Sequence, residues 1–326
     1  MNNQKTFHIF GGGVFVKHAI QIAKDNNWKV VLRTGDRFLN DLENYDDDSE
    51  VSLISGNSLG LLMEEGGMPK PQDIGISFSA PWVIPAKIIN LFNGQLYNLH
   101  NQPLPRFRGC GGTSWNIMMN DNEGGCSIHL LTPELDAGEI FAAKKFSFPK
   151  SFSFPKDFDE LVADEAIELL NEWLPVLLKT GSPGASVQNN DDESEYWPRL
   201  NTNIHAWIDW SWGLDNILSF CNAFSLPHLG AKTILNDKVI HITKGTVLAQ
   251  KNKYHPFQRG IIYKIIDSQL HIAHNDGTFI VEEYSFESDP PKIRLGDRLF
   301  TPTENLEASM LTRIQYSPDG KIFNLK

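Results

Sequence analysis

Cysteines and long apolar runs are both scarce in this chain. Its 326 residues include Cys110, Cys126 and Cys221, which are odd in number, widely spaced and without histidines at metal-ligand spacing. That pattern argues against a disulfide framework and against a zinc site, and it suits a reducing compartment. Nowhere do about 18 apolar residues follow one another, and glycines interrupt the first run. We therefore expect a cytoplasmic protein with no membrane span and no metal.

Basic residues are also fewer than acidic ones. Lysine and arginine number 29 against 40 aspartates and glutamates, which gives a net charge of −11. Proteins that bind polyanions neutralise phosphates with basic side chains, so bulk nucleic-acid binding is disfavoured, although a local basic groove is not excluded. The 41% hydrophobic and 21% charged residues are ordinary for a soluble chain with one or two cores. Two domains are the first expectation.

Strand and helix patterns alternate over the first part of the chain. Short apolar runs indicate strands, and longer stretches with a 3.6-residue period indicate helices. The expected strands cover 6–10, 29–32, 73–78 and 95–99, and the expected helices follow residue 13 and cover 85–92 and 157–178. This order predicts an α/β fold, with a doubly wound, Rossmann-like domain over residues 1–180.

Three consecutive glycines, Gly11 to Gly13, separate the first strand from the first helix. They are compatible with a phosphate site at a helix N-terminus, as in nicotinamide oxidoreductases. The spaced dinucleotide fingerprint is imperfect, however. A tight turn that lets helix and sheet approach closely is the alternative, and we favour it.

A polar, acidic segment marks the domain boundary. Residues 181–195 combine small and acidic side chains without an apolar period, which predicts a linker. Beyond it, residues 215–223 have a helical pattern, and several apolar runs separated by turn signals predict strands. We expect residues 196–326 to form a smaller domain that combines a helix with a β-rich, barrel-like sheet.

Three polar residues suggest the chemistry. Asn98 and His100 lie two apart at the end of a predicted strand, so they share a face at the sheet edge where ligands bind, and the next strand leads to a loop with Asp136. Asn98 suits an oxyanion donor, His100 a base and Asp136 a group that orients or stabilises the imidazole. With no nucleophilic Ser or Cys nearby, the substrate would supply the nucleophile. The alternative is that all three residues merely satisfy local turns.

Several motifs in order carry a resemblance. They are Asn98-Leu99-His100, the Leu-Pro-x-x-Arg-Gly pattern ending at Gly109, a helix around Trp115, the strand 125–131 and the loop 135–140. In this order they resemble the folate-dependent formyltransferase family. The resemblance implies that 10-formyltetrahydrofolate donates a formyl group to an amine, without a metal. It also implies that Asn98, His100 and Asp136 are catalytic.

The resemblance also points to a folate-binding loop before the Asn-Leu-His strand. Family members hold the pterin largely with backbone groups there, and each side chain has ordinary packing as its alternative role. Asn101 and Gln102 occupy the place where the family often has Pro-Ser, which puts local substrate contacts in doubt. The candidate lining residues are Ser79, Ala80, Pro81, Trp82, Val83 and Ile84.

The second domain and the acidic composition favour the sugar N-formyltransferase branch. Its members act on dTDP-, UDP- or GDP-linked amino deoxysugars for surface polysaccharides of the O-antigen type, and a homodimer is plausible. Arginines suit a diphosphate and tryptophans a base, with ion pairing and packing as the alternatives. A methionyl-tRNA formyltransferase and a noncatalytic folate- or nucleotide-binding protein are the alternative functions. The candidate substrate residues are Arg106, Arg108, Trp115, Trp197 and Arg199.

Overall fold

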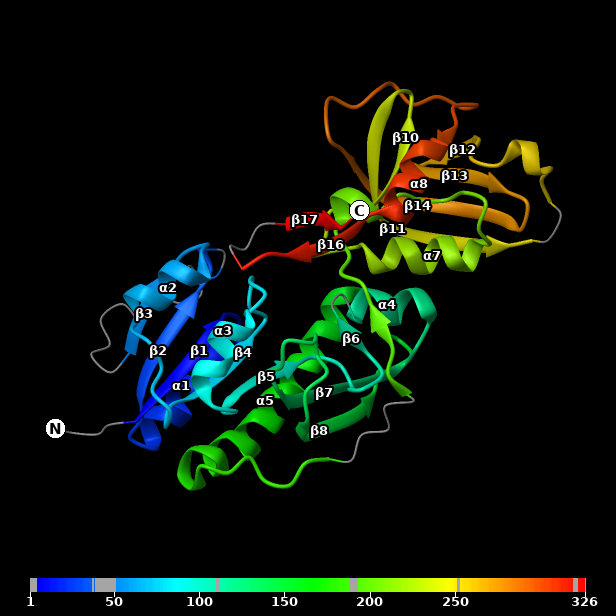
Figure 1. The fold of residues 1–326 in the computed structure, drawn as a ribbon. Helices are drawn as coiled ribbons and strands as arrows, with labels where there is room; N and C mark the ends of the chain where they lie inside the picture. Colours follow the sequence, from blue (N-terminus) through cyan, green and yellow to red (C-terminus); the bar gives the residue numbers. More distant parts are fainter. Residues whose placement is uncertain are drawn as a thin grey trace.

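Figure 1 shows the computed structural model of the protein, with an α/β part at the amino-terminal side and a second sheet at the carboxyl-terminal side. The structure describes residues 5–36, 38, 51–109, 112–187, 193–250, 253–318 and 322–325. Cys110 and positions 188–192 of the expected linker lie outside these ranges. None of the helices within them combines the length and apolarity needed to cross a bilayer.

The amino-terminal part is built on a seven-stranded sheet in the order β3-β2-β1-β4-β5-β7-β8. The first five of these strands are parallel, whereas β7 runs antiparallel to both β5 and β8. The strands are β1 (Thr6–Gly11), β2 (Lys29–Thr34), β3 (Val51–Ser55), β4 (Ile74–Phe78), β5 (Leu96–His100), β7 (Glu123–Leu130) and β8 (Ile140–Ser147). The parallel strands at the centre are almost wholly buried, as expected for a sheet covered on both faces.

Helices cover both faces of this sheet. α1 (Phe15–Asp25) and α5 (Pro155–Thr180) pack their apolar residues against one face. α2 (Leu59–Glu65) and α3 (Ala86–Ile89), which a 3-10 turn over Asn90–Phe92 continues, cover the other. This arrangement confirms the predicted doubly wound α/β class, while β3 and α2 were not predicted.

Gly11 explains the glycine turn. Its φ of +109° lies in a region that side chains rarely adopt, and a Cβ there would stand 1.9 Å from the carbonyl oxygen of Phe78. The neighbouring Gly12 N–H donates to that same oxygen. Only glycine lets the end of β1 approach β4 this closely, which supports the tight-turn alternative.

The carboxyl-terminal part is a six-stranded antiparallel sheet with α7 (Leu214–Ala223) packed on it. Its order is β12-β13-β14-β11-β10-β15. Register shifts between Ile242 and Gly245 bend the long strand β11, as bulges do. The strands are β10 (Ala231–Leu235), β11 (Lys238–Ala249), β12 (Ile262–Ile266), β13 (Gln269–His274), β14 (Gly277–Phe286) and β15 (Leu299–Phe300). The predicted α/β fold with a smaller β-rich second domain is confirmed.

Several short elements join the two parts. α4 (Gly112–Met119) packs against both α5 and α7, and β6 (Arg108–Gly109) pairs in parallel with β9 (Tyr196–Trp197). α6 (Thr202–His205) lies near α8 (Thr303–Leu311). After α8 the hairpin of β16 (Arg313–Tyr316) and β17 (Ile322–Leu325) extends back toward the first sheet (Figure 1). The domain boundaries at residues 180 and 196 stay a proposal.

Candidate active site

The end of β5 brings two candidate residues to a large cavity. Asn98 and His100 are both half-buried, alternate with buried apolar neighbours and therefore share one face of the strand. Both line a cavity of about 1000 Å³, and so does Asp136 from the loop after β7. This volume is at the upper end for small-molecule sites. The structure thus brings the three predicted catalytic residues together.

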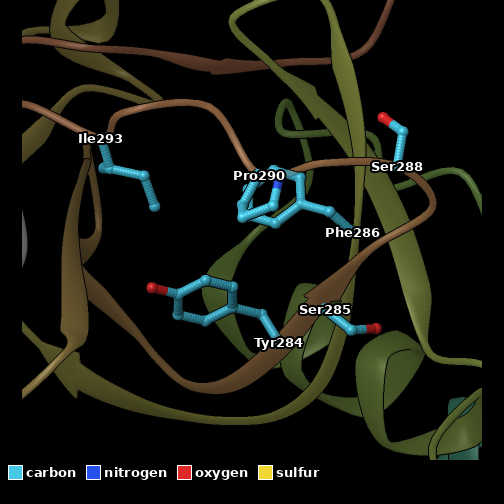
Figure 2. A pocket seen from close by; sticks show the side chains of 6 residues that line it. All are labelled: Tyr284, Ser285, Phe286, Ser288, Pro290 and Ile293. Carbon is cyan, nitrogen blue, oxygen red and sulfur yellow. The ribbon is translucent and has the colours of Figure 1, made fainter.

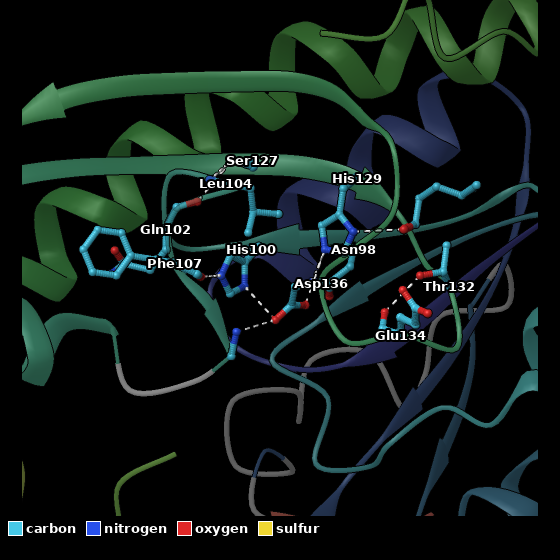
Figure 3. Close-up of polar contacts among 12 residues, drawn as sticks. Asn98, His100, Gln102, Leu104, Phe107, Ser127, His129, Thr132, Glu134 and Asp136 are labelled. Carbon is cyan, nitrogen blue, oxygen red and sulfur yellow. Dashed lines mark hydrogen bonds and ion pairs between the residues drawn. The ribbon is translucent and has the colours of Figure 1, made fainter. Parts of the chain in front are cut away.

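The contacts of the two ring nitrogens of His100 show which of them carries the proton (Figure 3). Its Nε2 lies 2.7 Å from the carbonyl oxygen of Phe107, so Nε2 must donate in that hydrogen bond. In the neutral ring the lone pair is then on Nδ1, which lies 3.9 Å from Oδ2 of Asp136. A proton taken up at Nδ1 would therefore be held next to a carboxylate.

Asp136 is kept ionised by its surroundings. Its φ of +49° is a left-handed conformation that aspartate tolerates better than most residues. Burial opposes ionisation, but His100 and the backbone N–H of Gly109, which donates to Oδ2 across 2.9 Å, lower the pKa of Asp136 to about 2. The carboxylate is thus a permanent negative charge at neutral pH.

His129 is a site residue that the sequence reasoning missed. It is completely buried on β7, directly opposite Asn98 in the antiparallel register of β5 and β7. Its Nδ1 lies 2.9 Å from the carbonyl oxygen of Leu130 and donates to it. The neutral ring then accepts at Nε2 from the Asn98 amide nitrogen, 3.1 Å away. A histidine between the apolar residues Ile128 and Leu130 of this strand was the available signal.

The predicted folate loop forms another wall of the same cavity. Five of its six predicted residues line the cavity, namely Ser79, Ala80, Trp82, Val83 and Ile84. Pro81 is not among the lining residues and lies against Gly35. The Trp82 indole is buried, and its Nε1 donates to the carbonyl oxygen of Asn57, so this ring shapes the loop from within. A largely apolar wall of this kind suits a flat heterocycle.

Most predicted substrate residues lie outside the cavity lining. Arg106 makes ion pairs with Asp121 and Glu123, each at 2.8 Å, and approaches Glu195 at 3.9 Å. Arg108 lies on β6 and is not among the lining residues either.

The two candidate tryptophans contact each other instead of the cavity. The rings of Trp115 and Trp197 are 5.3 Å apart, and Nε1 of Trp115 donates to the carbonyl oxygen of Pro198. Neither lines the cavity. This contact helps to join α4 with β9.

Arg199 does line the cavity, together with residues that the sequence reasoning did not name. Tyr196 lies on β9, which ends before Arg199. Arg313 and Gln315 come from β16, more than 100 residues later in the chain. Asn101 and Gln102, which stand where the family often has Pro-Ser, also line it.

A second, smaller hollow of about 410 Å³ lies at the end of β14 (Figure 2). Tyrosine, serine, phenylalanine, proline and isoleucine line it, so it offers no carboxylate, imidazole or cationic group for catalysis. Among the described residues, no three His, Cys, Asp or Glu side chains are grouped to hold a metal ion. The chemistry is therefore assigned to the large cavity.

Comparisons with known proteins agree with this architecture. The bifunctional polymyxin resistance protein ArnA of Wigglesworthia glossinidia brevipalpis is 26% identical over 181 residues, or 56% of this chain. Methionyl-tRNA formyltransferase of Clostridium novyi (strain NT) is 23% identical over 212 residues, or 64% of this chain. These matches span 27% and 65% of the lengths of the two relatives.

A solved structure shares the fold over most of the chain. The N-formyltransferase from Helicobacter canadensis, determined in complex with folinic acid and dTDP-3-aminofucose, superposes with a TM-score of 0.66. Its sequence is 18% identical, and the match covers 86% of this chain and 100% of that chain.

Family models match in both parts of the chain. The formyl transferase model matches residues 79–152, which contain the folate-loop candidates and the catalytic candidates. The model of the formyl transferase C-terminal domain matches residues 202–291, which include α7 and most of the second sheet. Their order in the chain follows the two parts of the fold. This chain therefore belongs to the formyl transferase family.

Proposed function

We propose that this protein transfers the formyl group of 10-formyltetrahydrofolate to the amine of a nucleotide-linked amino deoxysugar. The observation that carries the proposal is the meeting of Asn98, His100 and Asp136 in a cavity whose other wall is the loop 79–84. A volume of about 1000 Å³ leaves room for two ligands side by side. Membership of the formyl transferase family supports the reaction class.

The donor supplies a formyl carbon that an amine can attack, and the chain supplies the polar groups around it. The amide of Asn98 keeps one N–H toward His129 and has a second N–H to donate to the developing oxyanion. This donor is preorganised because His129 fixes the orientation of the amide. One such donor is typically worth about a hundredfold or more in rate.

His100 is placed to handle the proton. The attacking amine must be neutral and loses a proton as its bond to the formyl carbon forms, and Nδ1 of His100 carries the lone pair that accepts it. Asp136, at 3.9 Å, stabilises the resulting imidazolium. The same proton is then available to the folate nitrogen as the old carbon–nitrogen bond breaks, so that no external base is consumed.

The acceptor class rests on two independent supports. The net charge of −11 disfavours a tRNA substrate, while the structural neighbour from Helicobacter canadensis holds a dTDP-linked amino sugar. We infer a dTDP-, UDP- or GDP-linked amino sugar for this chain, used in surface polysaccharide synthesis of the O-antigen type. A cytoplasmic location and a homodimer complete the proposal, and light scattering after size-exclusion chromatography tests the dimer.

Release of tetrahydrofolate, followed by absorbance, tests the function. Purified protein is mixed with 10-formyltetrahydrofolate and a panel of dTDP-, UDP- and GDP-linked amino sugars, with initiator methionyl-tRNA in parallel. We expect turnover with one sugar and none with the tRNA. His100→Ala should abolish transfer and leave folate affinity nearly unchanged. Activity with the tRNA alone would replace the proposal by the methionyl-tRNA alternative, and full activity of His100→Ala would remove the role of that residue.

A further inference from the structure

Within the segment at residues 312–318, Arg313, Ile314 and Gln315 line the active-site cavity. His205 Nε2 donates to the carbonyl oxygen of Thr312 across 3.0 Å, and Ile314 forms an antiparallel bridge with Arg199. Further on, Val83 N–H of the folate loop donates to the carbonyl oxygen of Ser317. The segment is therefore held at one end by the second domain and at the other by the folate loop.

Within this segment, Arg313 lies over the ring of Tyr196. The guanidinium carbon is 5.0 Å from the ring centroid, and both residues line the cavity. Stacking on an aromatic face fixes the plane of a guanidinium group while its N–H donors stay at the edge. Tyr196 is 43% exposed, so the pair stands at an open part of the cavity rather than in the core.

The same pair is closely connected to the catalytic carboxylate. Tyr196 on β9 is the register partner of Arg108 on β6, and the next residue, Gly109, donates its N–H to Asp136. One step along a two-stranded sheet thus separates the Arg313–Tyr196 pair from the group that orients His100. A nucleotide-linked sugar whose amine reaches His100 has room to place its diphosphate, which stays bonded to the sugar, in this part of the same cavity.

Two arginines are the side chains with a permanent positive charge that line the described part of the cavity. Among the described residues that line the cavity, Arg199 and Arg313 are the arginines, and no lysine joins them, in a chain with a net charge of −11. Strand alternation sets these two apart: Arg199 pairs with Ile314, so its side chain points to the face of β16 opposite Arg313. Of the two, Arg313 is the one whose guanidinium lies over the ring of Tyr196.

We propose that Arg313, whose guanidinium stacks on the ring of Tyr196, binds the diphosphate of the nucleotide-linked acceptor. The inference rests on the proposed function for the identity of the acceptor. Guanidinium forms paired, directed hydrogen bonds to phosphate oxygens, which lysine does not reproduce. A residue from the last 15 positions of the chain thereby becomes part of acceptor recognition.

Direct binding tests this without any need for turnover. The full chain is titrated by calorimetry with dTDP, UDP, GDP and inorganic pyrophosphate. We expect one nucleoside diphosphate to bind the wild-type protein, Arg313→Gln to raise its Kd about tenfold to a hundredfold, and Arg313→Lys to recover part of that loss. Tyr196→Leu keeps the charge but loses the stacking, so we expect a Kd increase of several fold.

Arg298 provides a matched control. Its guanidinium lies 5.1 Å over the ring of Phe257, and it is not among the residues that line the cavity. Arg298→Gln removes an equivalent guanidinium and should leave the Kd unchanged, and melting curves should show that both variants are folded.

The outcomes separate this inference from the proposed function. Unchanged affinity of Arg313→Gln, or a wild-type protein that binds none of the four probes, overturns the inference. If Arg313→Gln loses nucleoside diphosphate binding while the wild-type protein transfers formyl to none of the sugars, the diphosphate site is supported and the proposed function is overturned. In a transfer assay we expect Arg313→Gln to raise KM for the sugar with little change in kcat or in KM for the folate.

Discussion

The Asn98 amide nitrogen lies 3.1 Å from Nε2 of His129, a nitrogen that accepts because the other nitrogen of the ring donates to a backbone carbonyl. His129 is not among the residues that line the cavity, so it acts through Asn98 as a positioning residue. The orientation of the proposed oxyanion donor thus depends on a buried side chain of the neighbouring strand.

Replacing His129 should therefore lower kcat through Asn98. His129→Leu leaves the amide without an acceptor, and we expect a fall in kcat of about tenfold, less than the loss of the donor itself. KM for the folate should stay the same. His129→Gln keeps an acceptor on the side chain and should recover much of the rate in steady-state assays. Wild-type kcat in His129→Leu would show that Asn98 needs no support.

Asp136→Asn should separate charge from shape. The amide is nearly isosteric, but it no longer stabilises a proton on His100, so we expect kcat to fall at least about a hundredfold while the protein still binds folate. Rapid-quench measurement of single-turnover transfer checks whether the chemical step itself is slowed. Glu134→Gln, on the same loop but not among the cavity-lining residues, is the control and should retain wild-type rates.

A charge placed in the folate slot should weaken the donor alone. Val83 is 36% exposed and lines the cavity, so Val83→Glu puts a carboxylate against the expected heterocycle. We expect KM for 10-formyltetrahydrofolate to rise about tenfold or more because a charge resists burial beneath a ligand. Nucleoside diphosphate affinity should not change.

Val176→Glu tests whether the effect is specific to the slot. Val176 is an exposed valine of α5 outside the cavity lining, so this variant adds the same charge elsewhere. Equal rises in KM for the folate in the two variants would contradict the assignment of the slot.

His8 should make the protein less stable at mildly acidic pH. Burial, followed by the charge of Arg33, lowers the pKa of His8 to about 4, while its Nε2 donates to Asp73 across 3.3 Å. Between pH 6.5 and 4 the unfolded chain binds a proton that the folded chain excludes, so the unfolding free energy falls as pH falls, by up to about 3 kcal/mol from this group. Urea unfolding of wild type and His8→Gln at pH 7.5 and 4.5 measures it.

His8→Gln should show a shallower pH dependence of the unfolding free energy than the wild type. His18→Gln, at an exposed position of α1, should follow the wild type. Parallel curves for His8→Gln and the wild type would show that His8 is not the group that titrates.

Part of the fold and of the site could be predicted because the signals are local. The buried run of β4 and the helical period of α5 follow from residues close in sequence, since burial of one face fixes the period. Asn98 and His100 could be placed together because residues two apart in a strand share a face. Asp136 could join them because its loop directly follows the neighbouring strand.

Other contacts depend on partners far away in the chain. Arg106 carries the residue type expected for a phosphate contact, yet Asp121 and Glu123 surround it. Trp115 and Trp197 contact each other across 82 positions instead of lining the cavity. Residue type sets what a side chain can bind, whereas only the folded chain sets what it meets.

The sequence by itself determined the alternating α/β plan, the glycine turn and the polar residues at the end of β5, because each follows from local geometry and burial. Tertiary structure decided the pairing of His129 with Asn98 and the return of Arg313 onto Tyr196. Strand register and the docking of a terminal hairpin depend on the free energy of packing the whole chain, which no local window contains.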